Sequence, residues 1–262
     1  ARAQGARPRG EGPASLGVAV DRLDRLHKGM QVFVDRKEAA GIVTLIAREG
    51  KTVDLHAVGF ADIEKNVPMK TDAIFRIASM TKPITSVAIM MLFEEGKLFL
   101  TDPVSKFIPA FKSSMVMEGV GADAKPVPAR RAITIRDLLT HTAGISYGTD
   151  QRVASQYEEA GLGPAAGFGW YTADKSEPIC ETMDRLGKLP FVSQPGQAWV
   201  YGYNTDILGC IVERVSGKPL NEFIRERITT PPGMNDTSFY LPVAKRDRLT
   251  TVYASSDGKA VR

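Results

Sequence analysis

The chain has 262 residues, of which 43% are hydrophobic, and its 34 Lys and Arg exceed its 30 Asp and Glu by four. This composition is typical of a globular protein with a sizeable core. Arg2, Arg7 and Arg9 lie near the start, so the remaining chain is close to neutral and gives no indication of a nucleic-acid partner. The longest apolar stretches, such as residues 86–93, are shorter than the roughly 20 residues of a membrane-spanning helix, which excludes a membrane protein.

The cysteines and histidines show no metal-binding spacing. Cys180 and Cys210 belong to no Cys-x-x-Cys or Cys/His cluster, which excludes a disulfide scaffold and a structural zinc site. We expect no metal and no cofactor. Cys210 lies within an apolar helical pattern and is expected to be a buried thiol, and the sequence leaves open whether the two cysteines meet.

The first predicted elements are a helix and a β-hairpin. Residues 14–38 carry apolar side chains at three- and four-residue steps, which predicts an amphipathic helix that covers a sheet. Residues 41–48 and 53–59 read as strands, joined by a turn at Glu49-Gly50. Because a lone hairpin is marginally stable in water, we expect further strands to come from elsewhere.

A strongly apolar helix follows over residues 79–96, with Pro83 in its first turn and Gly96 at its end. Apolar residues lie nearly all round it, which predicts a central, buried helix. Further helical patterns cover residues 133–141, 178–186 and 205–215, and short strand-like pieces cover residues 237–241 and 250–254.

These elements predict an α+β (α/β) fold in which helices flank an antiparallel sheet. Residues 1–13 form a flexible arm without a signal-peptide core, residues 14–112 and 227–262 an α/β lobe, and residues 113–226 a mostly helical lobe. The sequence does not separate a cytoplasmic from a periplasmic protein.

The motif Ser79-Met-Thr-Lys82 places a hydroxyl and an amine on one face of a helix start. A serine becomes a nucleophile when a neighbouring base takes its proton, and a buried lysine can serve as that base. The structural alternative is that Ser79 caps the helix and Lys82 is solvated. A second copy, Ser256-Asp-Gly-Lys259, contains a turn and is not expected to be active.

A rival serine occurs in Gly144-Ile-Ser146-Tyr-Gly148, which matches the Gly-x-Ser-x-Gly nucleophile elbow. That elbow requires a preceding strand and a later histidine. Here the preceding residues 134–141 read as a helix and every histidine lies upstream, so we interpret this motif as a loop that closes a helix.

Several aromatic residues precede the helical pattern that begins at residue 205. Tyr201 could exchange protons if its phenol faces a lysine, because an ammonium group favours the phenolate. The alternative is that Trp199, Tyr201 and Tyr203 pack in the interior.

In this order the motifs resemble those of the serine β-lactamase-like superfamily, which includes class C β-lactamases, D-alanyl-D-alanine carboxypeptidases and family VIII carboxylesterases. The resemblance runs from about residue 32 to 253 and rests on residues 75–82, 96–103, 134–144, 195–201 and 232–239. It implies a β-lactamase/transpeptidase-like fold. It also implies that Ser79 is the acylated nucleophile, Lys82 its proton acceptor and Tyr201 the third catalytic member.

The sequence departs from the superfamily pattern in two ways. Tyr203 stands two residues after Tyr201, where β-lactamases carry an Asn that contacts the substrate, and Asn204 follows one place later; we expect both residues to bind substrate. This departure favours esters. The second departure is that no late Lys-Thr-Gly motif occurs, so we expect a C-terminal segment or second chain to complete the sheet.

The prediction is therefore a serine hydrolase that cleaves small, short-chain carboxylic esters. The alternatives are a β-lactamase or D-Ala-D-Ala carboxypeptidase, and a non-catalytic binding protein of the same fold. No nucleic-acid or membrane partner is expected, and the sequence does not give the oligomeric state.

Overall fold

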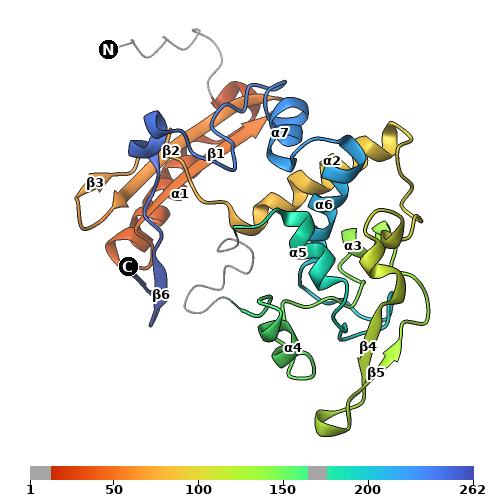
Figure 1. Ribbon diagram of the computed structural model, residues 1–262. Helices are drawn as coiled ribbons and strands as arrows, with labels where there is room; N and C mark the ends of the chain where they lie inside the picture. Colours follow the sequence, from red (N-terminus) through yellow and green to blue (C-terminus); the bar gives the residue numbers. More distant parts are fainter. Residues whose placement is uncertain (1–12, 165–175) are drawn as a thin grey trace. The chain divides into compact units, whose positions relative to one another are not determined.

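The computed structural model describes residues 13–164 and 176–262, which form two compact units (Figure 1). Of the described residues, the sheet unit comprises 13–77 and 240–262, and the helical unit comprises 78–164 and 176–239. The predicted N-terminal arm lies outside the described residues, apart from its last residue. The two units divide the chain at other positions than the predicted lobes, whose borders stay a prediction.

The predicted hairpin forms the centre of the sheet unit. Strand β1 (Gly41–Arg48) pairs antiparallel with β2 (Lys51–Asp62), which pairs in turn with β3 (Val67–Pro68). Glu49 and Gly50 between β1 and β2 have φ angles of 53° and 73°, the left-handed pair that a two-residue hairpin loop requires. Within the described residues β1 is an edge strand. That a further segment or a second chain completes the sheet stays a prediction.

Helix α1 (Val20–Asp35) packs against β1 and β2, as expected for an amphipathic helix, and buries Leu23 and Met30. A 3-10 turn (Pro13–Leu16) precedes it. The late part of the unit contains a 3-10 helix (Val243–Arg248) and a hairpin of β6 (Ala254–Ser256) and β7 (Lys259–Val261).

This late hairpin explains the second Ser-x-x-Lys copy. Ser256 and Lys259 are paired across the two strands, and Asp257 and Gly258 form the left-handed turn between them. The predicted turn within this motif is confirmed, and the inactivity of the motif stays a prediction. The predicted strand over residues 250–254 is wrong for all but Ala254, because residues 250–253 form no strand pairs.

Helix α6 (Asn204–Ser216) is the centre of the helical unit, and four other helices pack against it. They are α2 (Thr81–Glu94), α3 (Ile135–Leu139), α5 (Ile179–Leu186) and α7 (Leu220–Ile224) (Figure 1). The unit also contains α4 (Ala154–Glu159), a π-helical turn (Arg225–Thr229) and 3-10 turns at Ala78–Met80, Val104–Lys106, Pro109–Ser113 and Gly121–Asp123. The predicted helices around residues 135, 180 and 205 are thereby confirmed.

Three expectations for this unit are wrong. A hairpin of β4 (Met115–Glu118) and β5 (Lys125–Pro128) stands where helices and loops were expected, and residues 237–241 form no strand. Helix α2 is buried along one face, whereas Val87, Met90 and Phe93 on its other side are between 38% and 48% exposed. Mean apolarity alone did not distinguish a helix buried all round from one buried on a single face.

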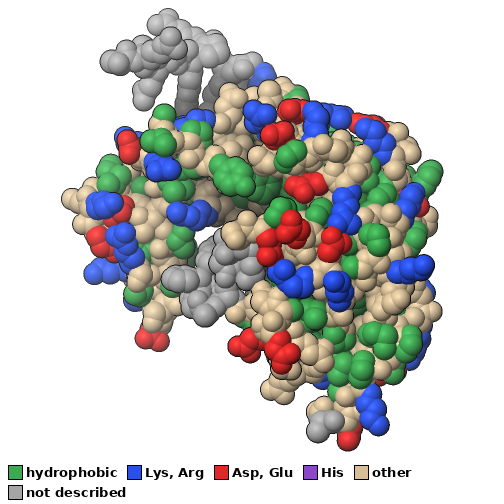
Figure 2. Space-filling view, viewed as in Figure 1, with side chains coloured by type: hydrophobic (Ala, Val, Ile, Leu, Met, Phe, Trp, Pro, Cys, Tyr) green, Lys and Arg blue, Asp and Glu red, His purple; other side chains and the backbone are tan. Residues whose placement is uncertain are grey.

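Lys and Arg side chains intermingle with Asp and Glu over the face seen in Figure 2, in agreement with the near-neutral charge of the chain body. Within residues 13–164 and 176–262, no helix has both the length and the apolar character of a membrane span.

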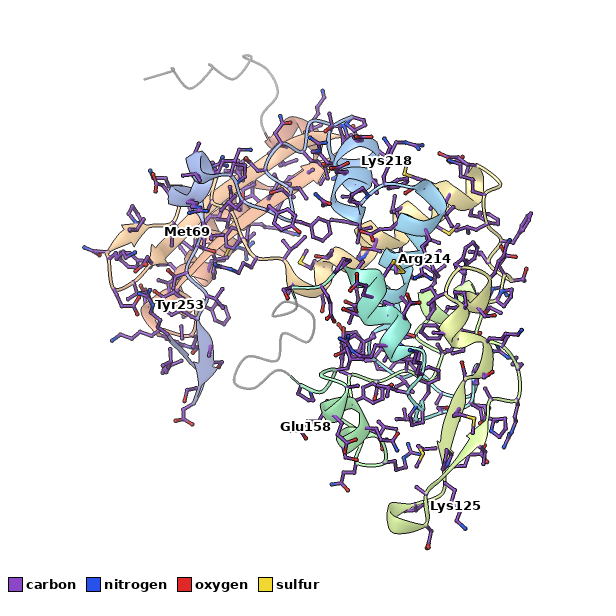
Figure 3. All side chains as sticks on the ribbon, in the orientation of Figure 1. Met69, Lys125, Glu158, Arg214, Lys218 and Tyr253 are labelled. Atoms are coloured by element: carbon purple, nitrogen blue, oxygen red, sulfur yellow. A yellow bond between two sulfur atoms is a disulfide. The ribbon has the colours of Figure 1, made fainter. Side chains whose placement is uncertain are left out.

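Two links join α5 to α6 in the helical unit. Cys180 at the start of α5 and Cys210 in α6 form a disulfide, with their Cα atoms 4.9 Å apart. Arg214, which projects from α6 (Figure 3), pairs with Asp184 of α5 at 2.6 Å. The disulfide corrects the expectation of a buried thiol at Cys210. Nothing in the local sequence signals it, because the packing of the two helices is what brings the sulfur atoms together.

We expect the disulfide to make a large contribution to stability. It closes a loop between cysteines 30 positions apart, for which the chain-entropy relation gives about 3–4 kcal/mol. Replacement of Cys180 and Cys210 by serine should lower the free energy of unfolding, measured in urea, by roughly 2–4 kcal/mol. Reductant should destabilise the unmodified protein to the same extent and leave the variant unaffected. Free thiols in the oxidised, unfolded protein would contradict the pairing.

Candidate active site

The Ser-x-x-Lys motif occupies the start of the helical unit. Ser79 lies in the 3-10 turn Ala78–Met80, which leads into α2, and Lys82 lies in the first turn of α2. Ala78 has a φ of 42°, a left-handed conformation that costs a non-glycine residue about 1–2 kcal/mol. Such strain is concentrated at functional sites, and here it directs the chain so that Ser79 is exposed at the helix start.

The structure brings Ser79, Lys82 and Tyr201 together. The Ser79 Oγ lies 2.7 Å from the Tyr201 hydroxyl, and the Lys82 Nζ donates a hydrogen bond to the same Oγ at 3.0 Å. Tyr201 is 122 positions from Ser79 and reaches it from the loop that precedes α6. The prediction that Tyr201, rather than Tyr203, meets the motif agrees with this geometry.

The charge of Lys82 favours ionisation of Tyr201. Partial burial opposes the phenolate, but hydrogen bonds with Lys82 and Ser79 and the charge of Lys82 together hold the pKa of Tyr201 below its usual value. The Lys82 Nζ also lies 4.6 Å from the centre of the Tyr201 ring. Because an ammonium group donates and cannot accept, the Ser79 proton has the Tyr201 oxygen as its acceptor when Lys82 is charged.

The rival serine has a structural role. The Ser146 side chain is 3% exposed, and its Oγ accepts a hydrogen bond from the Gly148 backbone N–H at 3.1 Å. This supports the interpretation of the Gly-x-Ser-x-Gly motif as a loop. The backbone of this loop packs closely against Gly202, the neighbour of Tyr201, because a Cβ at Gly202 would lie 2.2 Å from the Ile145 carbonyl oxygen.

We expect Gly202→Ala to damage both stability and activity. The added methyl group must push the loop that carries Tyr201 away from the backbone at Ile145 and Ser146. Overpacking of this kind costs about 1–3 kcal/mol. Urea unfolding together with ester hydrolysis would check the prediction. An alanine variant with unchanged stability and turnover would show that the loop does not need this close approach.

The two predicted substrate-binding residues lie in the interior. Tyr203 is fully buried and donates a hydrogen bond to the Leu162 carbonyl at 2.7 Å. Asn204 is also fully buried, and its amide donates to the Val200 carbonyl at 3.2 Å. Since neither side chain presents an atom to solvent, the geometry gives no support to the prediction that they contact substrate.

His141 was not predicted from the sequence to be part of the site. Its ring is stacked against Tyr201, with centroids 5.2 Å apart, and lies 5.9 Å from Trp199. Burial and the charge of Lys82 lower the pKa of His141, which favours the neutral imidazole. His141 has neither of the sequence signals that mark a functional histidine, because it is not at metal-ligand spacing from another ligand and it precedes Ser146.

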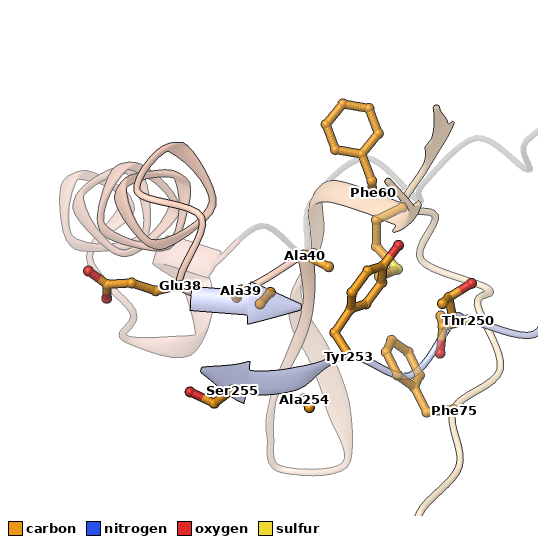
Figure 4. Close-up of a pocket in the computed structure, with 13 residues that line it drawn as sticks. Glu38, Ala39, Ala40, Phe60, Phe75, Thr250, Tyr253, Ala254 and Ser255 are labelled. Carbon is orange, nitrogen blue, oxygen red and sulfur yellow. The ribbon is translucent and has the colours of Figure 1, made fainter. Parts of the chain in front are cut away.

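Among the described residues, no group of three or more His, Cys, Asp or Glu side chains is placed to hold a metal ion. A cavity of about 230 Å³ lies within the sheet unit, lined in part by Phe60, Phe75 and Tyr253 (Figure 4). The Tyr253 hydroxyl accepts from the Ile63 N–H at 2.7 Å and donates to Glu64 at 2.6 Å. Both hydrogen-bonding roles of the hydroxyl at this cavity are therefore used within the sheet unit.

Comparison with known proteins identifies the family. Protein Rv1367c of Mycobacterium tuberculosis is 36% identical over 92% of this chain and 57% of its own length. Esterase EstB of Burkholderia gladioli is 32% identical over 86% of this chain and 53% of its own length. The chain thus spans about half the length of these curated relatives.

A solved structure of a related hydrolase has the same fold. That of EstCE1, described as a hydrolase with promiscuous acyltransferase activity, has a TM-score of 0.76 and 29% identity, covering 95% of this chain and 59% of the other. This likeness confirms the β-lactamase/transpeptidase-like fold. Residues 26–262 match the Beta-lactamase family, and the chain therefore belongs to that family.

Proposed function

We propose that the protein hydrolyses short-chain carboxylic esters through an acyl-enzyme on Ser79, with Lys82 and Tyr201 as the groups that handle protons. The observation that carries this proposal is the placement of the Ser79 Oγ between the Tyr201 hydroxyl at 2.7 Å and the Lys82 Nζ at 3.0 Å. A hydroxyl held between an ammonium group and a phenol of lowered pKa is suited to nucleophilic attack.

In the first half of the proposed reaction, the Ser79 Oγ forms a bond to the ester carbonyl carbon and gives its proton to the Tyr201 phenolate. The negative charge moves to the carbonyl oxygen. The Ser79 backbone N–H, at the start of a helical turn where amides lack intrahelical partners, donates to that oxygen. Tyr201 then returns the proton to the departing alkoxide, which leaves as the alcohol.

In the second half, water attacks the acyl-enzyme and gives a proton to Tyr201. The acyl–oxygen bond to Ser79 breaks, and the proton passes to the Ser79 Oγ, which restores the resting site. Lys82, which donates a hydrogen bond to the Ser79 Oγ, also holds the pKa of Tyr201 below its usual value through a hydrogen bond and its charge. Each step uses side chains that the structure brings together.

Two observations favour esters over β-lactams. The relative EstB is an esterase, and EstCE1 is described as a hydrolase. Asn204, next to the position where β-lactamases carry a substrate-binding Asn, is fully buried and directed at Val200. Because the Asn204 amide is buried, it cannot form a hydrogen bond with the side chain of a bound β-lactam.

Turnover of chromogenic substrates tests the proposal. We expect p-nitrophenyl acetate and butyrate to be hydrolysed faster than the octanoate, and a chromogenic cephalosporin to be hydrolysed far more slowly. If a cephalosporin or a D-Ala-D-Ala peptide were hydrolysed faster than these esters, the protein would instead be assigned as a β-lactamase or a peptidase. Absence of turnover and of covalent labelling in the folded protein would favour a non-catalytic binding protein.

A further inference from the structure

His141 stands just past the end of α3, in a conformation that is unfavourable for it. Its φ is 57°, in the left-handed region where a helix end usually carries glycine. Glycine adopts this conformation without steric cost, whereas a residue with a Cβ does not. The backbone conformation at this position therefore does not explain why the residue is a histidine.

The orientation of the imidazole is fixed by Asn204. The Asn204 Nδ2 lies 3.0 Å from the His141 Nδ1 and donates to the Val200 carbonyl at 3.2 Å. If the amide were turned over, its oxygen would face that carbonyl oxygen, which is repulsive. With Nδ2 in place, the buried Asn204 amide holds the Nδ1 edge of the His141 ring.

The fixed ring supports Tyr201. The rings of His141 and Tyr201 are inclined by 26° with centroids 5.2 Å apart, and Trp199 stacks on Tyr201 at 5.8 Å. Tyr147 meets the edge of Tyr201 at 5.6 Å. Trp199 is 67% exposed, whereas the His141 ring is hydrogen-bonded to the fully buried Asn204 amide. Of the rings that contact Tyr201, the His141 ring thus has its position set by a hydrogen bond to a buried side chain.

We propose that His141 is a positioning residue that holds the Tyr201 phenol against the Ser79 Oγ. This inference rests on the proposed function, since it assigns His141 a part in the proton transfer through Tyr201. Displacement of a reacting group by about 1 Å can cost roughly 100-fold in rate. Loss of the imidazole should therefore slow catalysis without weakening substrate binding.

The test compares His141→Gly and His141→Asn with the unmodified protein. Both substitutes tolerate the left-handed backbone, so at least one folded variant is expected. We expect kcat for p-nitrophenyl butyrate to fall about 30- to 100-fold, with KM within about twofold. In a Tyr201→Phe background the same substitutions should lower kcat by less than about twofold, because a residue that acts through the phenol has nothing left to position.

The outcomes separate this inference from the proposed function. Unchanged kcat in both His141 variants, in a protein that is labelled at Ser79 by a fluorophosphonate, would overturn the positioning role alone. An equal fall in kcat with and without the Tyr201 hydroxyl would also overturn it, because the effect would then be structural. If the unmodified protein is not labelled at Ser79, the proposed function fails and this inference fails with it.

Discussion

Ser79→Ala should lower kcat/KM for ester hydrolysis by roughly 10⁴-fold or more, because the variant has no atom that can form the acyl-enzyme. The Ser79 side chain is exposed, so its loss should leave the fold intact. Lys82 and Tyr201 remain in the variant but have no hydroxyl between them to activate. Steady-state hydrolysis of p-nitrophenyl butyrate, with unfolding in urea measured in parallel, would check both parts of this expectation.

Ser146→Ala is the matched control for Ser79→Ala. It removes the hydrogen bond that the Ser146 Oγ accepts from the Gly148 N–H, which should cost about 1 kcal/mol of stability. Its turnover should stay close to that of the unmodified protein. A loss of activity in Ser146→Ala that exceeds the loss in Ser79→Ala would contradict the assignment of Ser79 as the nucleophile.

Tyr201→Phe should reduce kcat by about 10²- to 10⁴-fold, the range for loss of a general acid–base group. The phenylalanine ring keeps the contacts with His141 and Trp199, so the change removes the hydroxyl and little else. The Ser79 proton then loses its acceptor at 2.7 Å. Pre-steady-state kinetics should show that acylation and deacylation are both slowed, since Tyr201 acts in each.

The pH dependence gives a separate test of Tyr201. In the proposed reaction the ionised phenol is the active base, and its fraction rises as pH rises through the pKa of Tyr201. Since Lys82 holds that pKa below its usual value of about 10, kcat/KM should rise with pH and level off below pH 10. Tyr201→Phe should lack this rise. An identical rise in the phenylalanine variant would show that another group is the base.

Local sequence patterns were sufficient for the elements whose signals are local. Apolar periodicity indicated α1, and the Glu49-Gly50 pair indicated the turn of the β1–β2 hairpin. The β4–β5 hairpin was missed because Pro126 and Pro128 lie in a strand that the same patterns read as a loop. Proline is tolerated there since β5 pairs with a single neighbour.

The candidate site could be predicted in part. Ser79 and Lys82 are three residues apart, so their proximity follows from helical geometry. Tyr201 is 122 positions from Ser79, and its selection over Tyr203 depended on resemblance to a known superfamily. His141 and the Cys180–Cys210 disulfide carry no local signal, because both depend on how α3, α5 and α6 pack together.

Covalent labelling with a fluorophosphonate tests the central claim most directly. Intact-mass spectrometry followed by peptide mapping should show one adduct, located on Ser79, in the unmodified protein and in Ser146→Ala. The adduct should be absent from Ser79→Ala. An adduct located on Ser146, or one that persists in Ser79→Ala, would contradict the assignment of Ser79 as the nucleophile.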